Sequence, residues 1–163
     1  RYAGVVATPD GPRLVFKGLE TVRTDWTWLA RRFQEELYRR VFLEEPFEDY
    51  VREVTARVLA GGCDAELVYR KRLRRKLDEY ERNVPPHVQA GRLYAERGLA
   101  PPSRGSWVEY VITTAGAEPA ANPLAPLDYQ HYVDRQLQPV ADGILGFAGT
   151  SFSTLVDAQI DLF

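Results

Sequence analysis

The chain has 163 residues and a formal net charge of −2, with 45% hydrophobic and 27% charged residues, as expected of one globular domain. The single cysteine, Cys63, excludes an internal disulfide and a cysteine-rich zinc site, and it fits a reducing cytoplasm. No apolar run is long enough to cross a membrane and no signal peptide is visible, so we expect no membrane partner. Because methionine is absent even at position 1, we expect a piece of a longer protein.

The first predicted element is a β-hairpin. Two apolar stretches, residues 5–7 and 13–16, flank Thr8-Pro9-Asp10-Gly11-Pro12. Proline fixes φ and glycine accepts a positive φ, so this segment favours a tight turn between two strands.

Two amphipathic helices are expected next. Asp25 is a candidate N-cap, and it precedes apolar residues at helical spacing, namely Trp26, Leu29, Phe33, Leu37 and Val41. Glu44-Glu45-Pro46 is expected to start the second helix, which Gly61 or Gly62 would end. Because the connection is short, the two helices should pack antiparallel.

The densest feature of the chain is the basic run, residues 70–76, which holds six cations in seven positions, Arg70-Lys71-Arg72-Leu73-Arg74-Arg75-Lys76. Such a run repels itself unless a polyanion lies against it, and nucleic acid is the obvious polyanion. The alternative is a solvated loop or a localisation tract. Interleaved apolar residues favour a folded unit, and we expect a strand over residues 66–73.

The rest of the chain predicts a mixture of helices and strands. Pro85-Pro86 should open a third helix over about residues 87–97, which Gly98 ends. Residues 107–114 alternate as a strand, whereas residues 115–126, with three prolines and a glycine, are expected to be irregular.

A long helix should run from Asp128 and be kinked or broken at Pro139. Ser151 or Ser153 would cap a last short helix, followed by a free tail, Gln159-Ile160-Asp161-Leu162-Phe163. The predicted fold class is therefore α+β and mostly helical, with antiparallel helices and short strands behind a β-hairpin.

The segment Lys17-Gly18-Leu19-Glu20 with Val22-Arg23-Thr24-Asp25 can be interpreted in two ways. It is either a capped helix start with an ion pair, or a phosphate-binding junction in which Lys17 and Arg23 are donors. This segment resembles the palm-to-thumb junction of family B DNA polymerases, especially their bacterial members. Arg1-Tyr2-Ala3-Gly4, the basic run and Asn83-Val84-Pro85-Pro86-His87-Val88 resemble further elements of the family in the same order, and the likeness covers essentially the whole chain.

The resemblance implies the end of a palm domain in residues 1–24, a thumb domain in residues 25–157 and a C-terminal tail in residues 158–163. It further implies contacts with double-stranded primer–template DNA, mainly through sugar and phosphate. If residues 66–73 form a strand, Arg70 and Arg72 point to one side and Lys71 to the other. The residues expected to contact DNA are Tyr2, Lys17, Arg23, Arg70, Lys71, Arg72, Arg74, Arg75, Lys76 and His87.

No catalytic residue is expected in this chain. Polymerase chemistry uses two divalent metals held by carboxylates, which in this family lie in upstream palm motifs. Asp25, Asp64, Asp78, Asp128, Asp134, Asp142 and Asp157 are scattered and are interpreted as structural or solvated. We expect Mg²⁺ in the intact polymerase and no cofactor here. His87 is interpreted mainly as a packing or capping residue, and His131 as uninvolved.

The last five residues match the pentapeptide with which bacterial replication proteins bind the sliding clamp. Leu162 and Phe163 could enter an apolar pocket, with Gln159 and Ile160 beside them; the alternative is an apolar end tucked against its own domain. The expected partners are thus duplex DNA, the clamp, and the upstream palm, fingers and exonuclease domains, in the cytoplasm at the nucleoid. The rival hypothesis is a non-enzymatic adaptor that binds the clamp without gripping DNA.

Overall fold

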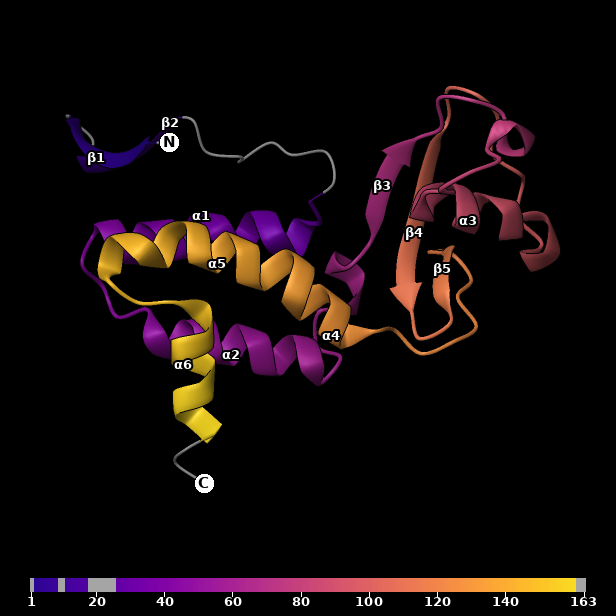
Figure 1. The fold of residues 1–163 in the computed structure, drawn as a ribbon. Helices are drawn as coiled ribbons and strands as arrows, with labels where there is room; N and C mark the ends of the chain where they lie inside the picture. The colour runs from indigo at the N-terminus through magenta and orange to yellow at the C-terminus, as the bar shows by residue number, and fades with distance from the viewer. Residues whose placement is uncertain (1, 9–10, 18–25, 161–163) are drawn as a thin grey trace.

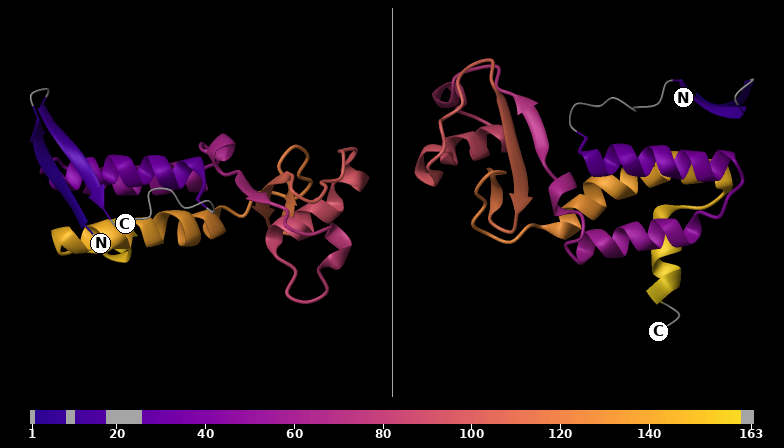
Figure 2. Two further views of the ribbon diagram at one scale, coloured as in Figure 1. Left: turned by 90° about the horizontal axis from the view of Figure 1, so that it is seen from above. Right: turned by 180° about the vertical axis from the view of Figure 1, so that it is seen from behind.

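The computed structural model describes residues 2–8, 11–17 and 26–160, with side chains over residues 26–157. Figure 1 shows two lobes, a helical lobe built from α1, α2, α4, α5 and α6 and a sheet lobe built from β3, β4, β5 and α3. Seen from above, the two lobes lie end to end (Figure 2). The fold is α+β and mostly helical, as predicted.

The N-terminal hairpin is confirmed. Strand β1 (Tyr2–Thr8) pairs antiparallel with β2 (Gly11–Lys17), and Thr8 lies opposite Gly11 at the turn.

Helix α1 (Trp28–Phe42) begins later than predicted, and its N-cap is Thr27 rather than Asp25. The Thr27 hydroxyl accepts a hydrogen bond from the Ala30 N–H at 3.3 Å and donates to Gln136 Oε1 at 3.0 Å. The Thr27 backbone N–H donates to the same Gln136 oxygen at 3.0 Å. A residue 109 positions away therefore fixes where this helix starts, because it holds the capping side chain in place.

Helix α2 (Glu48–Leu59) also begins later than predicted, because Glu44 takes a φ of 57° that no α-helix accommodates. Its buried face is Val51, Val54, Thr55 and Val58. Gly61, with a φ of 82°, follows the helix end as expected. Helices α1 and α2 run in opposite directions (Figure 1).

The long C-terminal helix is continuous but not uniformly α-helical. Helix α4 (Tyr129–Tyr132) passes into a π-helical segment, η4 (Val133–Leu137), and then into α5 (Gln138–Leu145), which lies along α1. Asp128 caps α4 by accepting from the His131 N–H at 3.2 Å. The predicted irregularity at Pro139 is therefore a widened turn just before that residue.

The chain ends in α6 (Phe152–Ile160), after the short turn η5 (Gly146–Ala148). Of the two candidate caps, Ser151 accepts from the Thr154 N–H at 3.3 Å. The predicted free tail is wrong for Gln159 and Ile160, which continue the helix because no helix-breaking residue precedes them.

The sheet lobe has the strand order β3-β4-β5, all antiparallel. Strand β3 (Tyr69–Arg72) is shorter than predicted, because residues 64–66 form the 3₁₀ turn η1 (Asp64–Glu66). Strand β4 (Trp107–Thr113) lies in the centre, as predicted for residues 107–114.

Strand β5 (Gly116–Pro119) corrects the prediction of an irregular segment over residues 115–126. Helix α3 (Pro86–Leu93) packs on β4 and β5, and the turn η3 (Ala95–Arg97) follows it up to Gly98. A short turn, η2 (Leu77–Glu79), precedes α3. Among the described helices, none has the length and apolar character needed to span a bilayer.

Candidate nucleic-acid interface

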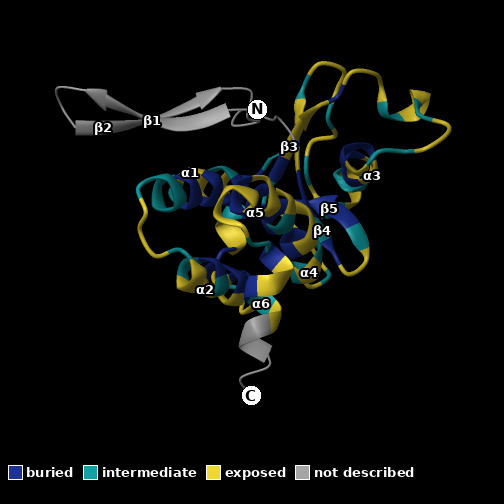
Figure 3. Cartoon of the chain, turned by 60° about the vertical axis from the view of Figure 1, so that its left-hand side comes forward, coloured by how far each residue is buried: buried dark blue, intermediate teal, exposed yellow. Residues whose placement is uncertain are grey.

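The basic run follows β3 and the loop beyond it, at the outer part of the sheet lobe. Leu73 is fully buried and anchors the run, whereas all six cations are exposed. Beyond the strand, the Leu73 N–H donates to Ser106 O at 2.8 Å and the Gly105 N–H donates to Leu73 O at 2.7 Å. Figure 3 shows the loops around this region as mostly exposed. The run is thus an ordered part of the fold with its charges directed to the surface.

The side chains of the run alternate between the two faces of the sheet. Arg72 lies opposite Trp107 and Arg70 opposite Glu109, so these four residues share one face. The guanidinium carbons of Arg70 and Arg72 lie 4.4 Å and 5.3 Å from the centre of the Trp107 ring. Lys71 lies on the other face, opposite Val108. The predicted alternation is confirmed.

An aromatic ring also supports the loop beyond β3. The guanidinium of Arg75 lies over Tyr80, 5.5 Å from the ring centre. A guanidinium resting on an aromatic face keeps its N–H groups at the edge, where they can still donate to an anion. The sequence did not predict Trp107 and Tyr80 as supports. Trp107 is 35 residues from Arg72 in the chain, and Tyr80 meets Arg75 across the turn at Leu77–Glu79.

Among residues 26–157, the cations of the basic run have almost no carboxylate partners. Within residues 26–157, the run's one ion pair joins Arg70 Nε to Glu109 Oε1 at 3.9 Å, with both side chains more than half exposed. Elsewhere in the same residues, arginines of α1, α2 and η3 form ion pairs of 2.6 to 3.2 Å, namely Arg32–Glu66, Arg39–Glu36, Arg40–Glu36, Arg52–Asp49 and Arg97–Glu118. The run therefore keeps a local excess of positive charge that the fold does not neutralise.

His87 lies beneath this surface rather than on it. Its side chain is only 4% exposed and meets the edge of the Tyr80 ring, with ring centroids 6.3 Å apart. Burial and the nearby charge of Lys71 lower the pKa of His87, so the ring stays neutral at pH 7. This position fits the packing role that the sequence suggested.

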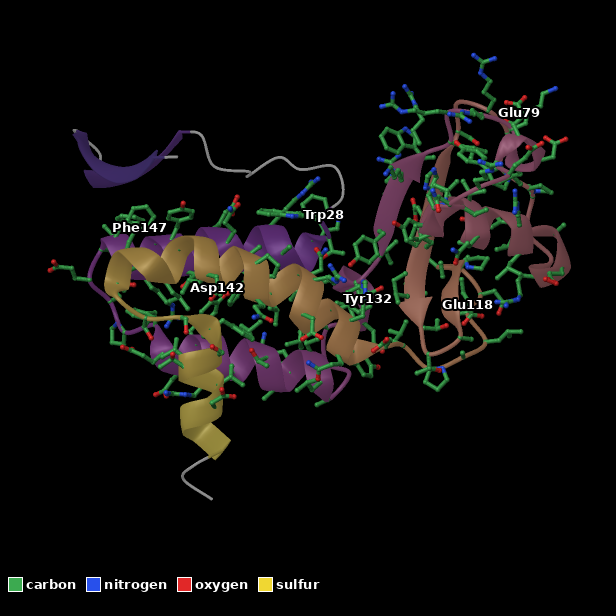
Figure 4. The ribbon with its side chains drawn as sticks, viewed as in Figure 1. Trp28, Glu79, Glu118, Tyr132, Asp142 and Phe147 are labelled. Carbon is green, nitrogen blue, oxygen red and sulfur yellow. The ribbon has the colours of Figure 1, made fainter. Side chains whose placement is uncertain are left out.

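His131 corrects the sequence-based interpretation. Predicted to be uninvolved on a polar helix face, it is half-buried, and its Nε2 lies 2.8 Å from the Tyr69 hydroxyl oxygen. Tyr69 stacks on Tyr110 and Tyr132, with ring centroids 5.2 Å and 5.5 Å apart. Figure 4 shows Tyr132 between the two lobes. These residues form a joint that fixes the sheet lobe to the helical lobe.

The other predicted site residues are less fully described. Tyr2 and Lys17 lie opposite each other at the open end of the hairpin, and their side chains lie outside the described residues. Arg23, Leu162 and Phe163 lie wholly outside them, as does Asp25.

Several aspartates have structural partners, as predicted. Besides the cap at Asp128, Asp142 accepts from the Phe152 N–H at 2.9 Å, and Asp64 accepts from the Tyr129 hydroxyl at 3.2 Å. In the part of the chain that the structure describes, no three His, Cys, Asp or Glu side chains gather as metal ligands would. The described residues therefore do not fit a two-metal site.

Comparison with known proteins defines the class. A model of DNA polymerase family B matches residues 1–145, so the chain belongs to this family. It is 56% identical to DNA polymerase II of Escherichia coli over all of this chain and 22% of that protein. It is 32% identical to DNA polymerase 2 of Aeropyrum pernix over 93% of this chain and 20% of that protein.

A solved structure agrees with this assignment. The family B DNA polymerase of Pyrobaculum calidifontis superposes with a TM-score of 0.69 at 29% identity, over 88% of this chain and 20% of that one. The chain spans about a fifth of the length of these relatives.

Proposed function

We propose that this chain is the thumb of a family B DNA polymerase and that it grips primer–template duplex through phosphate contacts. The observation that carries the proposal is the basic run, six exposed cations on β3 and its loop with a single long ion pair among the described residues. Contacts to phosphate hold DNA without reading its sequence, as a polymerase that copies any template requires.

The geometry suggests how the run divides its contacts. Arg70 and Arg72 are held against Trp107 on one face, and Lys71 is on the other, so the three cannot all contact one strand in the same way. Arg74, Arg75 and Lys76 continue the charge into the loop. We add Tyr2, Lys17 and Arg23 to the DNA contacts only because their segments resemble family B polymerases. His87 is buried, so we assign it to packing.

A charge-matched comparison tests the duplex grip. Arg74→Gln with Arg75→Gln removes two charges from the basic run, whereas Arg32→Gln with Arg57→Gln removes two from exposed positions of α1 and α2. The first variant should bind a primer–template duplex more weakly, by of order tenfold per lost phosphate contact near 0.1 M salt, and the second should bind nearly as the native chain does. Equal losses would show that only net charge matters and would contradict the proposal.

The intact parent protein, on this proposal, is a template-directed nucleotidyltransferase at the bacterial nucleoid, and this chain contributes grip rather than chemistry. Two Mg²⁺ ions would stabilise the attacking and leaving oxygens in its palm. This chain's own residues would hold the duplex behind the primer end.

We also propose that the C-terminal pentapeptide binds the sliding clamp, on the likeness of residues 159–163 to clamp-binding peptides. Gln159 and Ile160 form the end of α6, so an extended grip on the clamp requires the last helical turn to unwind. A terminal turn frays at small cost.

Substitution at the end of the chain tests the clamp proposal. Leu162→Ala with Phe163→Ala should reduce clamp binding in surface plasmon resonance by at least about 100-fold, since two buried apolar side chains contribute about 3–6 kcal/mol. Thr154→Ala, an exposed change in the same helix, should leave it unchanged. Undiminished binding by the first variant would refute a role for the tail.

A further inference from the structure

The three tryptophans of the chain meet at one hollow, although Trp107 is far from Trp26 and Trp28 in sequence. The hollow has a volume of about 160 Å³ and is lined by Trp26, Trp28, Arg31, Val68, Arg70 and Trp107. It lies where the start of α1 faces β3 and β4, on the sheet face that carries Arg70 and Arg72.

Two of these rings are exposed in a way that folding alone does not require. Trp28 is 67% exposed and Trp107 is 42% exposed, both large apolar areas left to solvent. Figure 4 shows Trp28 on the side of α1 away from α2. An exposed indole at the rim of a hollow offers an apolar face to a ligand.

Each exposed ring has an arginine over it. Arg31 lies 5.3 Å from the Trp28 ring centre, and Arg70 lies 4.4 Å from that of Trp107. None of the described residues that line the hollow is acidic, and Arg70 meets Glu109 only at 3.9 Å. The hollow thus combines flat apolar walls with positive charge.

This combination fits one kind of ligand. An unpaired nucleotide has a planar base that stacks on aromatic or guanidinium planes and a phosphate that an arginine can bind. A cavity of about 150 Å³ can hold a benzene ring, so this hollow has room for one ring system and not for a base-paired duplex. We propose that the hollow binds an unpaired nucleotide of single-stranded DNA, with Trp28 and Trp107 as stacking surfaces and Arg70 as the phosphate donor.

This site goes beyond the duplex grip proposed above. Arg70 is common to both, but the tryptophans carry no charge and contribute nothing to counterion release. Trp28 lies under Arg31, outside the basic run, so substituting Trp28 separates the two proposals.

The test uses the full chain and a short fluorescein-labelled oligothymidylate, with binding measured by anisotropy. Trp28→Leu and Trp107→Leu should each weaken oligothymidylate binding, by about 5- to 150-fold for a lost stacked base. Trp28→Leu should change duplex binding little, whereas Trp107→Leu should also weaken duplex binding, because Trp107 holds Arg70 and Arg72. The matched control is Phe147→Leu, because Phe147 is 56% exposed at the other end of the helical lobe and should affect neither ligand.

The Arg74→Gln, Arg75→Gln variant keeps the outcomes distinct. This variant should weaken duplex binding more than oligothymidylate binding. If its duplex binding is unchanged, the proposed duplex grip is wrong, whereas the nucleotide site in the hollow is tested separately by the tryptophan variants. Unchanged oligothymidylate binding by both tryptophan variants would overturn the proposal. So would parallel losses for both DNAs in the Trp28 variant, which would show that Trp28 supports the duplex grip rather than an unpaired base. If the hollow bound a polyglutamate peptide more tightly than oligothymidylate, the nucleotide proposal would also be overturned, in favour of an acidic protein partner.

Discussion

At the scale of single residues, the joint between the lobes includes a hydrogen bond between Tyr69 and His131. A neutral His131 can accept the phenol proton at 2.8 Å, whereas a protonated one cannot. Replacing Tyr69 with Phe should lower the free energy of unfolding by about 1 kcal/mol. Urea denaturation measures this, and Tyr80→Phe, which keeps the ring that supports Arg75, is the matched control.

The same joint predicts a dependence on pH. Burial lowers the pKa of His131, with Arg135 acting the same way and Asp128 and Asp134 opposing it; burial also lowers the pKa of His87. The unfolded chain therefore binds more protons than the folded one just below the usual histidine pKa of 6.5. The stability that the neutral histidines contribute is fully present above pH 6.5, and it is lost as the pH falls from there through the lower pKa values of the folded chain.

Denaturation at several pH values between about 7.5 and 5.5 checks this expectation, since histidines titrate in that range. The double variant His87→Gln, His131→Gln should lose most of the slope that the native chain shows. A native chain with equal stability across the range would contradict it.

Glu118 makes a second residue-scale prediction. Its side chain is almost fully buried, and its carboxylate pairs with Arg97 at 2.8 Å and accepts from the N–H groups of Leu124 and Ala125. Burial opposes its ionisation, but hydrogen bonds from Thr113, the two N–H groups and Arg97 outweigh burial and hold the pKa at about 2. Its contribution to stability should persist above pH 4.5 and disappear as the pH falls towards 2.

Glu118→Ala should therefore cost about 3–5 kcal/mol, because it removes a nearly buried carboxylate and leaves the largely buried Arg97 without it. Glu109→Ala removes an exposed ion pair from the neighbouring strand and should cost below about 1 kcal/mol. Thermal unfolding of the two variants measures both losses of stability. Similar losses would contradict a special role for the buried Glu118 carboxylate.

At the scale of elements, the π-helical turn is explained by the spacing of buried residues. The buried pairs 132/133, 136/137, 140/141 and 144/145 recur every four residues. An α-helix has 3.6 residues per turn, so this spacing would drift off the core unless a wider turn absorbed the difference. The turn also precedes Pro139, which has no N–H to donate.

Deleting Asp134, which is exposed in this turn, should leave the flanking faces in register as one regular helix. Combined with Pro139→Ala, the deletion should cost less than about 2 kcal/mol, whereas the deletion alone should cost about 3 kcal/mol more through the proline clash. Deleting the exposed Glu53 from α2 rotates buried residues outward and should abolish cooperative unfolding. Thermal melts followed by circular dichroism measure the stability of all three variants. If the Glu53 deletion variant unfolded cooperatively, the explanation of the π-helical turn by residue spacing would be contradicted.

The elements that the sequence predicted well are those with strong local signals. The hairpin turn, the apolar periodicity of α1 and α2 and the prolines before α3 each act within a few residues. Strand β5 was missed because Gly116-Ala117-Glu118-Pro119 has no β-forming pattern, and it becomes a strand through pairing with β4. The start of α1 was misplaced because Asp25 and Thr27 are both able to cap, and Gln136 decides between them.

At the scale of the whole molecule, the sequence predicted the basic run and the alternation of its side chains. It could not predict that Trp107 would hold Arg70 and Arg72, that His131 would reach Tyr69, or that Trp26 and Trp28 would meet Trp107 at one hollow. These contacts join residues 35 to 81 positions apart, so only the assembled lobes bring them together. The candidate interface therefore combines a charge pattern visible in the sequence with a geometry that tertiary packing creates.

The most direct test of the DNA grip is the salt dependence of duplex binding by this chain. If about four residues of the basic run contact phosphates, the logarithm of the binding constant should fall with the logarithm of salt concentration at a slope near −3 to −4. Neutralising Arg70, Lys71, Arg72, Arg74, Arg75 and Lys76 together should flatten that slope. Identical slopes for the two proteins, or no duplex binding by the native chain at low salt, would contradict the account.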